Sequence, residues 1–215
     1  MVLKAILDDY DAYVDAAFKV VPPRPLREHL QARAERAAAI VFDGAWPAVA
    51  LFRLKRWLRE RHLYALAWLC DLLSRSIWHV FIGHNVEIGP GLIIAHGNVV
   101  IDGKCRLGRD VQISPFVTIG LSNSARLGFS VYGPTIGDNV YIGTGAKLLG
   151  PITIGDNVRI GANAVVVDDV PSDTTVVGVP ARVTGPNPWT VGPMAAHAPQ
   201  RRPRRSKTSE APPGA

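Results

Sequence analysis

The sequence predicts a mainly β protein, a solenoid of six-residue repeats preceded by a small α-helical region. Three observations carry this prediction. Between residues 81 and 183, a large aliphatic residue recurs at almost every sixth position. A glycine directly follows most of these residues, and a smaller apolar residue stands four places after them. Residues 2–20 and 46–78 instead space their apolar residues at the intervals of an amphipathic helix.

The aliphatic column has thirteen members, which are Ile82, Ile88, Ile94, Ile101, Leu107, Ile113, Ile119, Ile136, Ile142, Leu148, Ile154, Ile160 and Val166. A period of six fits neither a helix nor an alternating strand, so it indicates an internal repeat of one short strand and one turn. Strands this short bury their apolar side only when they are wound into a prism around a shared axis. The glycine after each anchor is expected to supply the backbone freedom that the corners need.

The chain divides into three parts by composition. Helical segments are expected at 2–20, at about 26–41 and, longest, at 46–78, and Pro22, Pro23 and Pro25 end the first of them. The tail is rich in proline and cations and is expected to be disordered. We therefore expect a helical region at 1–79, the solenoid at 80–185 and the tail at 186–215.

Charge and cysteine content exclude several classes of function. The net charge is +6, but the tail holds five cations against one acid, which leaves only +2 elsewhere. No nucleic-acid-binding face is therefore expected. Cys70 and Cys105 make no disulfide framework and suit a reducing cytoplasm. Acidic residues interrupt any apolar leader at the N-terminus, and no stretch is long enough to span a membrane.

The segment 46–78 combines an apolar side with a basic side, and this pattern has two interpretations. One is a helix that lies on a membrane surface, with weak association. The other, which we favour, is a helix that packs on the solenoid or on a neighbouring subunit and keeps its cations in water. The cations concerned are Arg53, Lys55, Arg56, Arg59, Arg61 and Arg75.

Two irregularities interrupt the repeat, and irregularities are where repeat proteins usually build sites. A seven-residue step separates Ile94 from Ile101 and contains His96, and an inserted loop runs from Gly120 to Pro134. A lone histidine is more often structural. At such a step, however, His96 is a candidate general base, a role worth about 10²- to 10⁴-fold in rate.

Other reactive residues are weaker candidates. His79, His84 and His96 suggest zinc by composition, but residues of a three-sided coil stack only about every 18 positions, so His84 and His96 point from different faces. We expect no metal site. Cys105 belongs to the inward column and is expected to act as a small hydrophobic residue rather than a nucleophile.

Several motifs in order resemble the hexapeptide-repeat acyltransferases, and within them the serine O-acetyltransferase-like group. The motifs are Ile88-Gly89-Pro90-Gly91-Leu92 leading to His96-Gly97, Val117-Thr118-Ile119-Gly120, the run PTIGDNVYIGTGAKLLG at 134–150, Ile160-Gly161-Ala162-Asn163-Ala164-Val165-Val166, and Val177-Gly178-Val179-Pro180-Ala181-Arg182-Val183. The resemblance implies a left-handed parallel β-helix, homotrimers with active sites between neighbouring prisms, and acetyl-CoA as the donor.

The resemblance also implies roles for individual residues. His96 matches the general base of the family. The pantetheine arm of acetyl-CoA is expected along the backbone near Gly143-Thr144 and Gly161-Ala162, and Lys147 and Arg182 are expected to meet the CoA phosphates.

The departures from the serine enzymes concern the acceptor. The acid that precedes the base in that group is Ala95 here, and the acid that orients the base falls at Phe81. The Arg-His pair before the proline of the loop is replaced by Tyr132-Gly133. A pocket that loses these charges is expected to bind serine poorly, because charges of the substrate are left unpaired.

Three functions follow from this pattern. The leading hypothesis is an acetyl-CoA-dependent O-acetyltransferase that modifies a sugar or a glycan or glycolipid intermediate. The alternatives are a serine O-acetyltransferase of cysteine biosynthesis and a catalytically inactive scaffold. Asn98 and Asp102 are candidates to orient His96, and Arg126 and Tyr132 are candidates to contact the acceptor.

Overall fold

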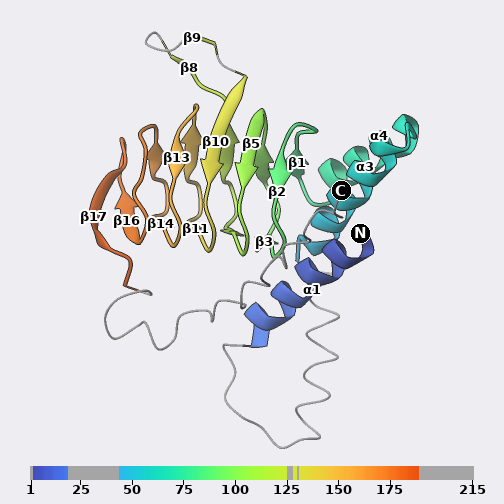
Figure 1. The fold of residues 1–215 in the computed structure, drawn as a ribbon, viewed down its shortest axis with the longest axis horizontal. Coiled ribbons are helices and arrows are strands. Elements are labelled where there is room, and N and C mark those ends of the chain that lie inside the picture. The colour runs from blue at the N-terminus through green and yellow to red at the C-terminus, as the bar shows by residue number, and fades with distance from the viewer. Residues whose placement is uncertain (1, 19–43, 125–127, 130, 189–215) are drawn as a thin grey trace, which may run out of the picture.

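The computed structural model describes residues 2–18, 44–124, 128–129 and 131–188. Three helices lie at one end of a stack of short strands (Figure 1). They are α1 (Val2–Phe18), α3 (Trp46–Glu60) and α4 (Tyr64–Ile77). The expected helix at 26–41 and the tail from residue 189 lie outside the described residues.

The strands form a prism with three sheets, and successive strands along the chain pass from one sheet to the next. The first sheet contains β1 (Val80–Ile82), β4 (Val99–Ile101), β7 (Thr118–Gly120), β12 (Lys147–Leu149) and β15 (Val165–Val166). The second contains β2 (Glu87–Ile88), β5 (Lys104–Leu107), β10 (Tyr132–Ile136) and β13 (Thr153–Ile154). The third contains β3 (Ile93–Ile94), β6 (Gln112–Ile113), β11 (Tyr141–Ile142), β14 (Arg159–Ile160), β16 (Thr174–Val177) and β17 (Arg182–Pro186).

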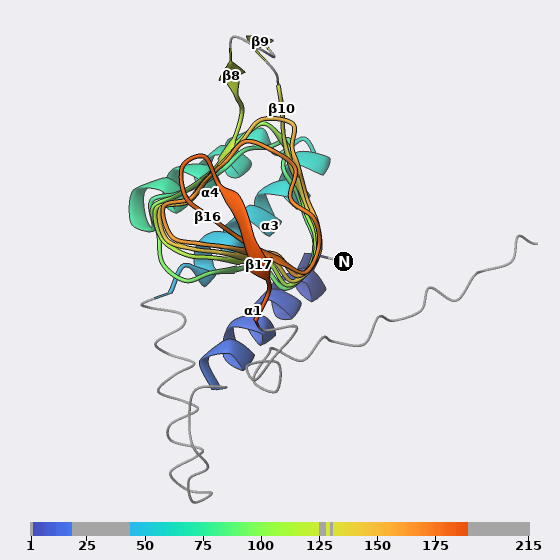
Figure 2. The ribbon, with the colours of Figure 1, turned by 90° about the vertical axis from the view of Figure 1, so that its left-hand side faces the viewer.

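All strand pairs within the prism are parallel, except that β17 runs back antiparallel to β16 and ends the third sheet. Seen from the end, the coils lie over one another, and a hairpin projects from one corner (Figure 2). The hairpin consists of β8 (Asn123–Ser124) and β9 (Gly128–Phe129), which belong to the inserted loop. The fold class predicted from the six-residue period is thus confirmed.

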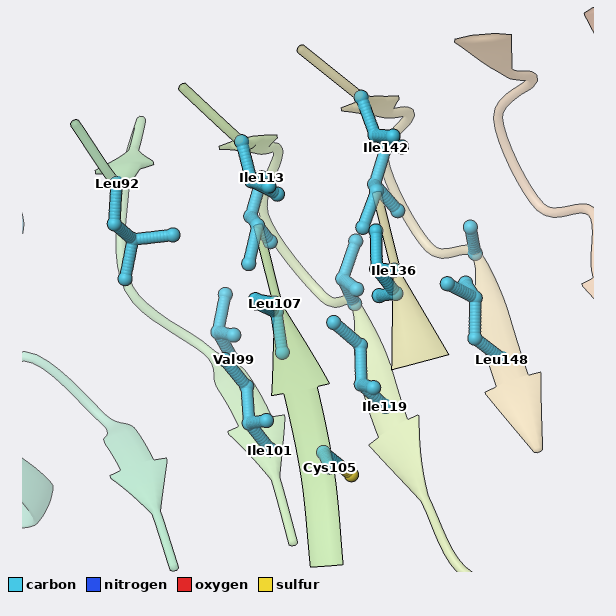
Figure 3. Packing of buried hydrophobic residues seen from close by; sticks show 14 of the residues in the cluster. Leu92, Val99, Ile101, Cys105, Leu107, Ile113, Ile119, Ile136, Ile142 and Leu148 are labelled. Atoms are coloured by element: carbon cyan, nitrogen blue, oxygen red, sulfur yellow. The ribbon is translucent and has the colours of Figure 1, made fainter. Parts of the chain in front are cut away.

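The aliphatic column forms the core. Its thirteen members are all buried, and the register places each directly over its counterpart in the next coil, as with Ile94, Ile113, Ile142 and Ile160 in the third sheet. Figure 3 shows such stacking for Ile113 and Ile142, with Ile119 and Leu148 beside them. Each coil buries its apolar side chains against the coils before and after it, so the prism has one continuous core.

The glycines that follow the anchors have a different purpose from the one expected. A β-carbon at Gly89 would lie 2.6 Å from the carbonyl oxygen of Gly108, and one at Gly143 would lie 2.7 Å from the nitrogen of Ala162. The left-handed backbone conformation is needed two residues after the glycine. Asn139, for example, follows Gly137 by two residues and has a φ of 56°. Most anchor glycines are therefore required by the close approach of stacked coils, and the left-handed turn falls to the next-but-one residue.

The long segment 46–78 is two helices rather than one. The chain reverses between α3 and α4 at residues 61–63, where His62 has a φ of 59°. The two helices pack against each other around Leu58, Ala67 and Cys70. The spacing of apolar residues correctly predicted a helical conformation for both α3 and α4. It did not predict the turn between them, because the same spacing continues after the turn.

Two cations of this segment are buried, contrary to the expectation that all of them face water. Arg53 donates to the carbonyl oxygens of Ile88 and Gly89, at 2.6 Å each. Lys55 donates to the carbonyl oxygen of Ile82 at 2.6 Å. These carbonyls belong to the first coil, which has no preceding coil to bond with. The helices therefore close the open end of the prism with charged donors.

Each buried cation also has an acidic partner. Arg53 pairs with Asp9 of α1 at 2.9 Å, and Lys55 pairs with Asp71 of α4 at 2.7 Å. Burial lowers the pKa of Lys55, and the hydrogen bond and charge of Asp71 oppose that shift. The two acids therefore compensate the positive charges of Arg53 and Lys55, which are buried where they bond the end of the prism.

The outer side of α4 carries several exposed apolar residues. On α4 the small residues Ala67 and Cys70 face inward, whereas Leu66, Trp68 and Ile77 are exposed. A cavity of about 340 Å³ between the helices is lined by Ile6, Trp46, Pro47, Ala50, Leu51, Leu54, Leu73, Ile77 and Trp78. None of the described helices is long and apolar enough to cross a membrane. Weak association with a membrane surface stays a prediction.

The C-terminal end of the prism reaches slightly beyond the expected boundary at residue 185. β17 ends at Pro186, and Asn187 is buried. The side chain of Asn187 donates to the carbonyl oxygen of Asn157 at 2.7 Å. Its backbone N–H donates to the carbonyl oxygen of Asp173, also at 2.7 Å. Truncation after Gly185 would therefore remove contacts that a truncation after residue 188 keeps.

Candidate active site

The corner between the third and first sheets brings together residues that are far apart in the chain. The paired positions Ile94, Ile113, Ile142 and Ile160 of the third sheet set the register. Two residues beyond each of them stand His96, Pro115, Thr144 and Ala162 respectively. We call this row the His96 column. It runs parallel to the prism axis, and His96, Thr144 and Ala162 are all exposed.

The column has the dimensions of an extended ligand. Neighbouring parallel strands lie about 4.8 Å apart, so Thr144 stands about 10 Å and Ala162 about 14 Å from the level of His96. Gly143 and Gly161 precede these two residues, and the absence of side chains there lets the coils approach closely. The structure thus places the predicted base and the predicted cofactor-binding backbone in one line.

The turn that carries His96 holds one residue more than the turns below it. In the later coils, a left-handed residue comes three positions after the anchor, as at Phe116 and Gly145. In the first coil it comes four positions after the anchor, at Asn98, with a φ of 62°. The seven-residue step is therefore an insertion within the corner itself.

The backbone around His96 is held closely, but its ring is not. A β-carbon at Gly97 would overlap the carbonyl oxygen of Trp78, and the backbone N–H of Asn98 donates to that oxygen at 3.3 Å. Among the described residues, none forms a hydrogen bond with the imidazole. Phe81, which stands where an orienting acid was expected from the resemblance, lies half-buried beneath the guanidinium of Arg75, 5.3 Å from the ring centre.

Asp102 and Tyr132 do not reach His96 within one chain. Strand β4 lies between the His96 turn and Asp102. Because an extended strand rises about 3.3 Å per residue, Asp102 is about 13 Å from Asn98. The Asp102 carboxylate accepts a hydrogen bond from the N–H of Gly103 at 2.8 Å. Tyr132 is exposed in the second sheet, with the ammonium of Lys104 5.0 Å from its ring centre. Both residues belong to a second corner, and Arg126 lies outside the described residues.

The two cations proposed for phosphates lie further along the prism. Lys147 is on the outer face of the first sheet, and its ammonium donates to the carbonyl oxygen of Phe116 at 2.7 Å. Arg182 is exposed at the start of β17 and pairs with Asp168 at 3.2 Å. Both are surface cations with weak partners, so both have donors to offer to an anionic ligand.

Phe116 was missed by the sequence reasoning. It occupies the left-handed position of its corner, with a φ of 63°, and 59% of it is exposed. A bulky side chain in this conformation costs about 1–2 kcal/mol, which glycine or asparagine largely avoids. The signal was present in the repeat, because equivalent corner positions hold Asn98, Gly145 and Asn163. Phe116 is therefore an exposed aromatic residue in a strained conformation one coil from His96, and its role is open to test by substitution.

Neither cysteine is suited to act as a nucleophile. Burial raises the pKa of Cys105 to about 12, and the charge of Asp102 adds to the shift. The thiol of Cys105 donates to the carbonyl oxygen of Asp102 at 3.0 Å. Burial also raises the pKa of Cys70. Within the described part of the chain, no group of three or more His, Cys, Asp and Glu side chains is placed to hold a metal ion.

Known proteins share this architecture and much of this sequence. Residues 133–168 match the family described as bacterial transferase hexapeptide (six repeats). The serine acetyltransferase of Helicobacter pylori strain J99 is 39% identical over 160 residues, which cover 74% of this chain and 91% of that protein. The chain belongs to the serine acetyltransferase family. It is accordingly an acetyl-CoA-dependent acyltransferase with a left-handed parallel β-helix.

Other members differ in how much of their length is matched. The serine acetyltransferase of Mycobacterium tuberculosis strain H37Rv is 42% identical over 134 residues, which cover 62% of this chain and 57% of that protein. Among solved structures, the serine acetyltransferase from Vibrio cholerae has a TM-score of 0.71 and 28% identity, covering 87% of this chain and 68% of that one. A serine acetyltransferase in complex with CoA has a TM-score of 0.68 and 25% identity, covering 85% and 69%.

Replacing Phe116 by asparagine is expected to separate stability from function. Asparagine tolerates the left-handed conformation, so the free energy of unfolding should stay the same or rise by up to about 1 kcal/mol. The KM for acetyl-CoA or for the acceptor should rise several-fold. Denaturant unfolding and steady-state kinetics measure the two effects. A loss of stability with unchanged KM values would show that Phe116 is structural.

Proposed function

We propose that the protein is a serine O-acetyltransferase in which His96 is the general base. The observation that carries this proposal is the His96 column, an exposed histidine in line with Thr144 and Ala162, in a chain about 40% identical to serine acetyltransferases. His96 takes the proton of the serine hydroxyl, whose oxygen bonds to the acetyl carbonyl carbon. The carbon–sulfur bond breaks, and CoA leaves as a thiolate that recovers the proton from His96.

The donor lies along the His96 column in this proposal. The thioester is placed at His96, and the pantetheine arm follows the backbone past Thr144 and Ala162. Lys147 and Arg182 bind the CoA phosphates through charge-assisted hydrogen bonds, which are stronger than neutral ones. A rigid prism suits this task, because its corners hold the base and the donor in fixed relation.

The acceptor pocket needs more than one chain. Among the described residues of one chain, none forms a hydrogen bond with the His96 ring, and the cations Lys147 and Arg182 are assigned to the donor in this proposal. We propose a homotrimer in which a neighbouring prism completes the pocket, with Asp102 and Tyr132 of that neighbour as candidates. Arg126, in the inserted loop, is a further candidate for the carboxylate. This arrangement gives the second corner a role that a single chain cannot give it.

A sugar hydroxyl is the second candidate acceptor. The observation that favours it is the pair Ala95 and Phe81, which present a methyl group and an aromatic ring where the resemblance led us to expect acids. A zwitterion gains nothing from apolar groups, whereas a sugar carries no charge to pair. The 39% identity to the Helicobacter pylori serine acetyltransferase, over 91% of that protein, supports serine as the first candidate.

One assay distinguishes these proposals. Thiol release from acetyl-CoA is followed with L-serine, with a panel of neutral sugars, and with no acceptor, and the products are identified by mass spectrometry. We expect O-acetylserine, with kcat/KM for serine at least tenfold above that for any sugar. A higher kcat/KM for a sugar would overturn serine as the acceptor. Failure of every acceptor to stimulate thiol release would favour the inactive scaffold.

A further inference from the structure

The strand that leads into the His96 turn has an open edge, and one side chain of α1 fills it. Ile93 and Ala95 donate their N–H groups to the next coil, at 2.9 Å each. Ile94, between them, directs its N–H and C=O to the opposite side, where the third sheet has no further strand. The Tyr13 hydroxyl accepts from the N–H of Ile94 at 2.6 Å and donates to its carbonyl oxygen at 2.7 Å.

The same helix holds the turn before this strand. Asp9, one helical turn before Tyr13, accepts hydrogen bonds from the N–H groups of Gly91 and Leu92 at 2.9 and 3.1 Å. Both side chains are buried. Burial also raises the pKa of Tyr13, so the hydroxyl keeps its proton over the working pH range and remains a donor to Ile94. α1 thus supplies the contacts that an additional coil would otherwise make.

The far side of the His96 turn is held by residues that follow α4. Asn98 donates its N–H to the carbonyl oxygen of Trp78 at 3.3 Å, and Val99 donates to that of His79 at 3.2 Å. In the later coils these contacts come from the coil before, as when Gly145 donates to Pro115 at 2.9 Å. The next coil therefore holds one side of the His96 turn through Ala95, and the helical region with the residues that follow it holds the other.

We infer that Tyr13 is a positioning residue for His96, through the two hydrogen bonds that it makes with Ile94. This role rests on the proposed function of His96 as the general base. Ile94 is two residues from His96, and a displacement of about 1 Å at a reacting group can cost about 10²-fold in rate. In this proposal the helical region positions the general base, in addition to covering the end of the prism.

Tyr13→Phe tests the inference, because it deletes only the hydroxyl oxygen. Two measurements are made on the full chain. Amide hydrogen exchange at Ile94 should accelerate at least tenfold, because its N–H loses its partner. The kcat with the best acceptor should fall about tenfold, whereas the KM for acetyl-CoA should stay within twofold, since neighbouring coils hold Thr144 and Ala162.

Asn187→Ala is the matched control. The side chain of Asn187 is also buried and donates to a backbone carbonyl oxygen, that of Asn157 at 2.7 Å, but at the opposite end of the prism from the His96 turn. This variant should lower Tm by a similar amount and leave kcat unchanged. The inference is overturned if Tyr13→Phe leaves the exchange of Ile94 unchanged, or if its kcat falls no further than that of Asn187→Ala. If wild-type protein uses no acceptor, the proposed function fails, and exchange at Ile94 alone decides whether Tyr13 holds this strand.

Discussion

Replacing His96 by asparagine is expected to lower kcat by about 10²- to 10⁴-fold, because the hydroxyl of the acceptor loses the group that takes its proton. The effect should fall on kcat rather than on donor binding. Thr144 and Ala162 lie in later coils, at about 10 and 14 Å from the level of His96, and they do not depend on the imidazole. The dissociation constant of CoA, measured by calorimetry, should therefore change less than twofold.

His62→Asn provides the comparison for this variant. His62 is also an exposed histidine, but it lies between α3 and α4, where its Nδ1 is 2.9 Å from the hydroxyl of Tyr64, away from both corners of the prism that the proposed site uses. Asparagine tolerates the left-handed conformation of this position, whose φ is 59°. The replacement should leave kcat within twofold of wild type. Equal losses in the two variants, or full activity in His96→Asn, would remove His96 from the mechanism.

Replacing Asp9 by asparagine should destabilise the fold by about 3–5 kcal/mol, the usual cost of leaving one member of a buried ion pair alone. The Asp9 side chain is fully buried and that of Arg53 is 8% exposed. Arg53 in turn bonds the carbonyl oxygens of Ile88 and Gly89, so the guanidinium cannot turn toward water without losing the cap. Equilibrium unfolding in urea measures the loss.

A surface pair at the same end of the prism shows what an exposed ion pair contributes. Arg106 and Glu87 are 3.0 Å apart, with side chains 69% and 59% exposed. Glu87→Gln should change the free energy of unfolding by less than about 1 kcal/mol. If Asp9→Asn costs no more than Glu87→Gln, the buried pair is not what closes the prism.

The fold was predictable because the repeat is local. An aliphatic residue every six positions, such as Ile142 and Leu148, states where the chain turns and which side is buried, without knowledge of any distant partner. The glycines were predicted correctly as a feature of the corners but for the wrong reason. The contact that excludes a side chain at Gly143 is made by Ala162, in the next coil, and no local pattern reports a distance between coils.

The candidate site was predictable in part. His96 stood out because it interrupts the period. Thr144 and Ala162, which the resemblance links to the pantetheine arm, lie in one column with it, and the roles of all three stay predictions. Asp102 was assigned to the same site because it is close in sequence, but an intervening strand carries it to another corner. Phe116 carried a signal that became clear only when the left-handed position of each corner was known.

By itself, the sequence determined the period, the buried column and the position of the irregular step, because each follows from short-range spacing of apolar residues and glycine. The tertiary structure alone decided which corners meet and what closes the open end. The sequence predicted that Arg53 and Lys55 face solvent. In the structure they donate hydrogen bonds to backbone carbonyl oxygens of the first coil, because no strand precedes that coil to pair with them. Tyr13 and Ile94 are 81 residues apart, and only the docking of α1 on β3 joins them.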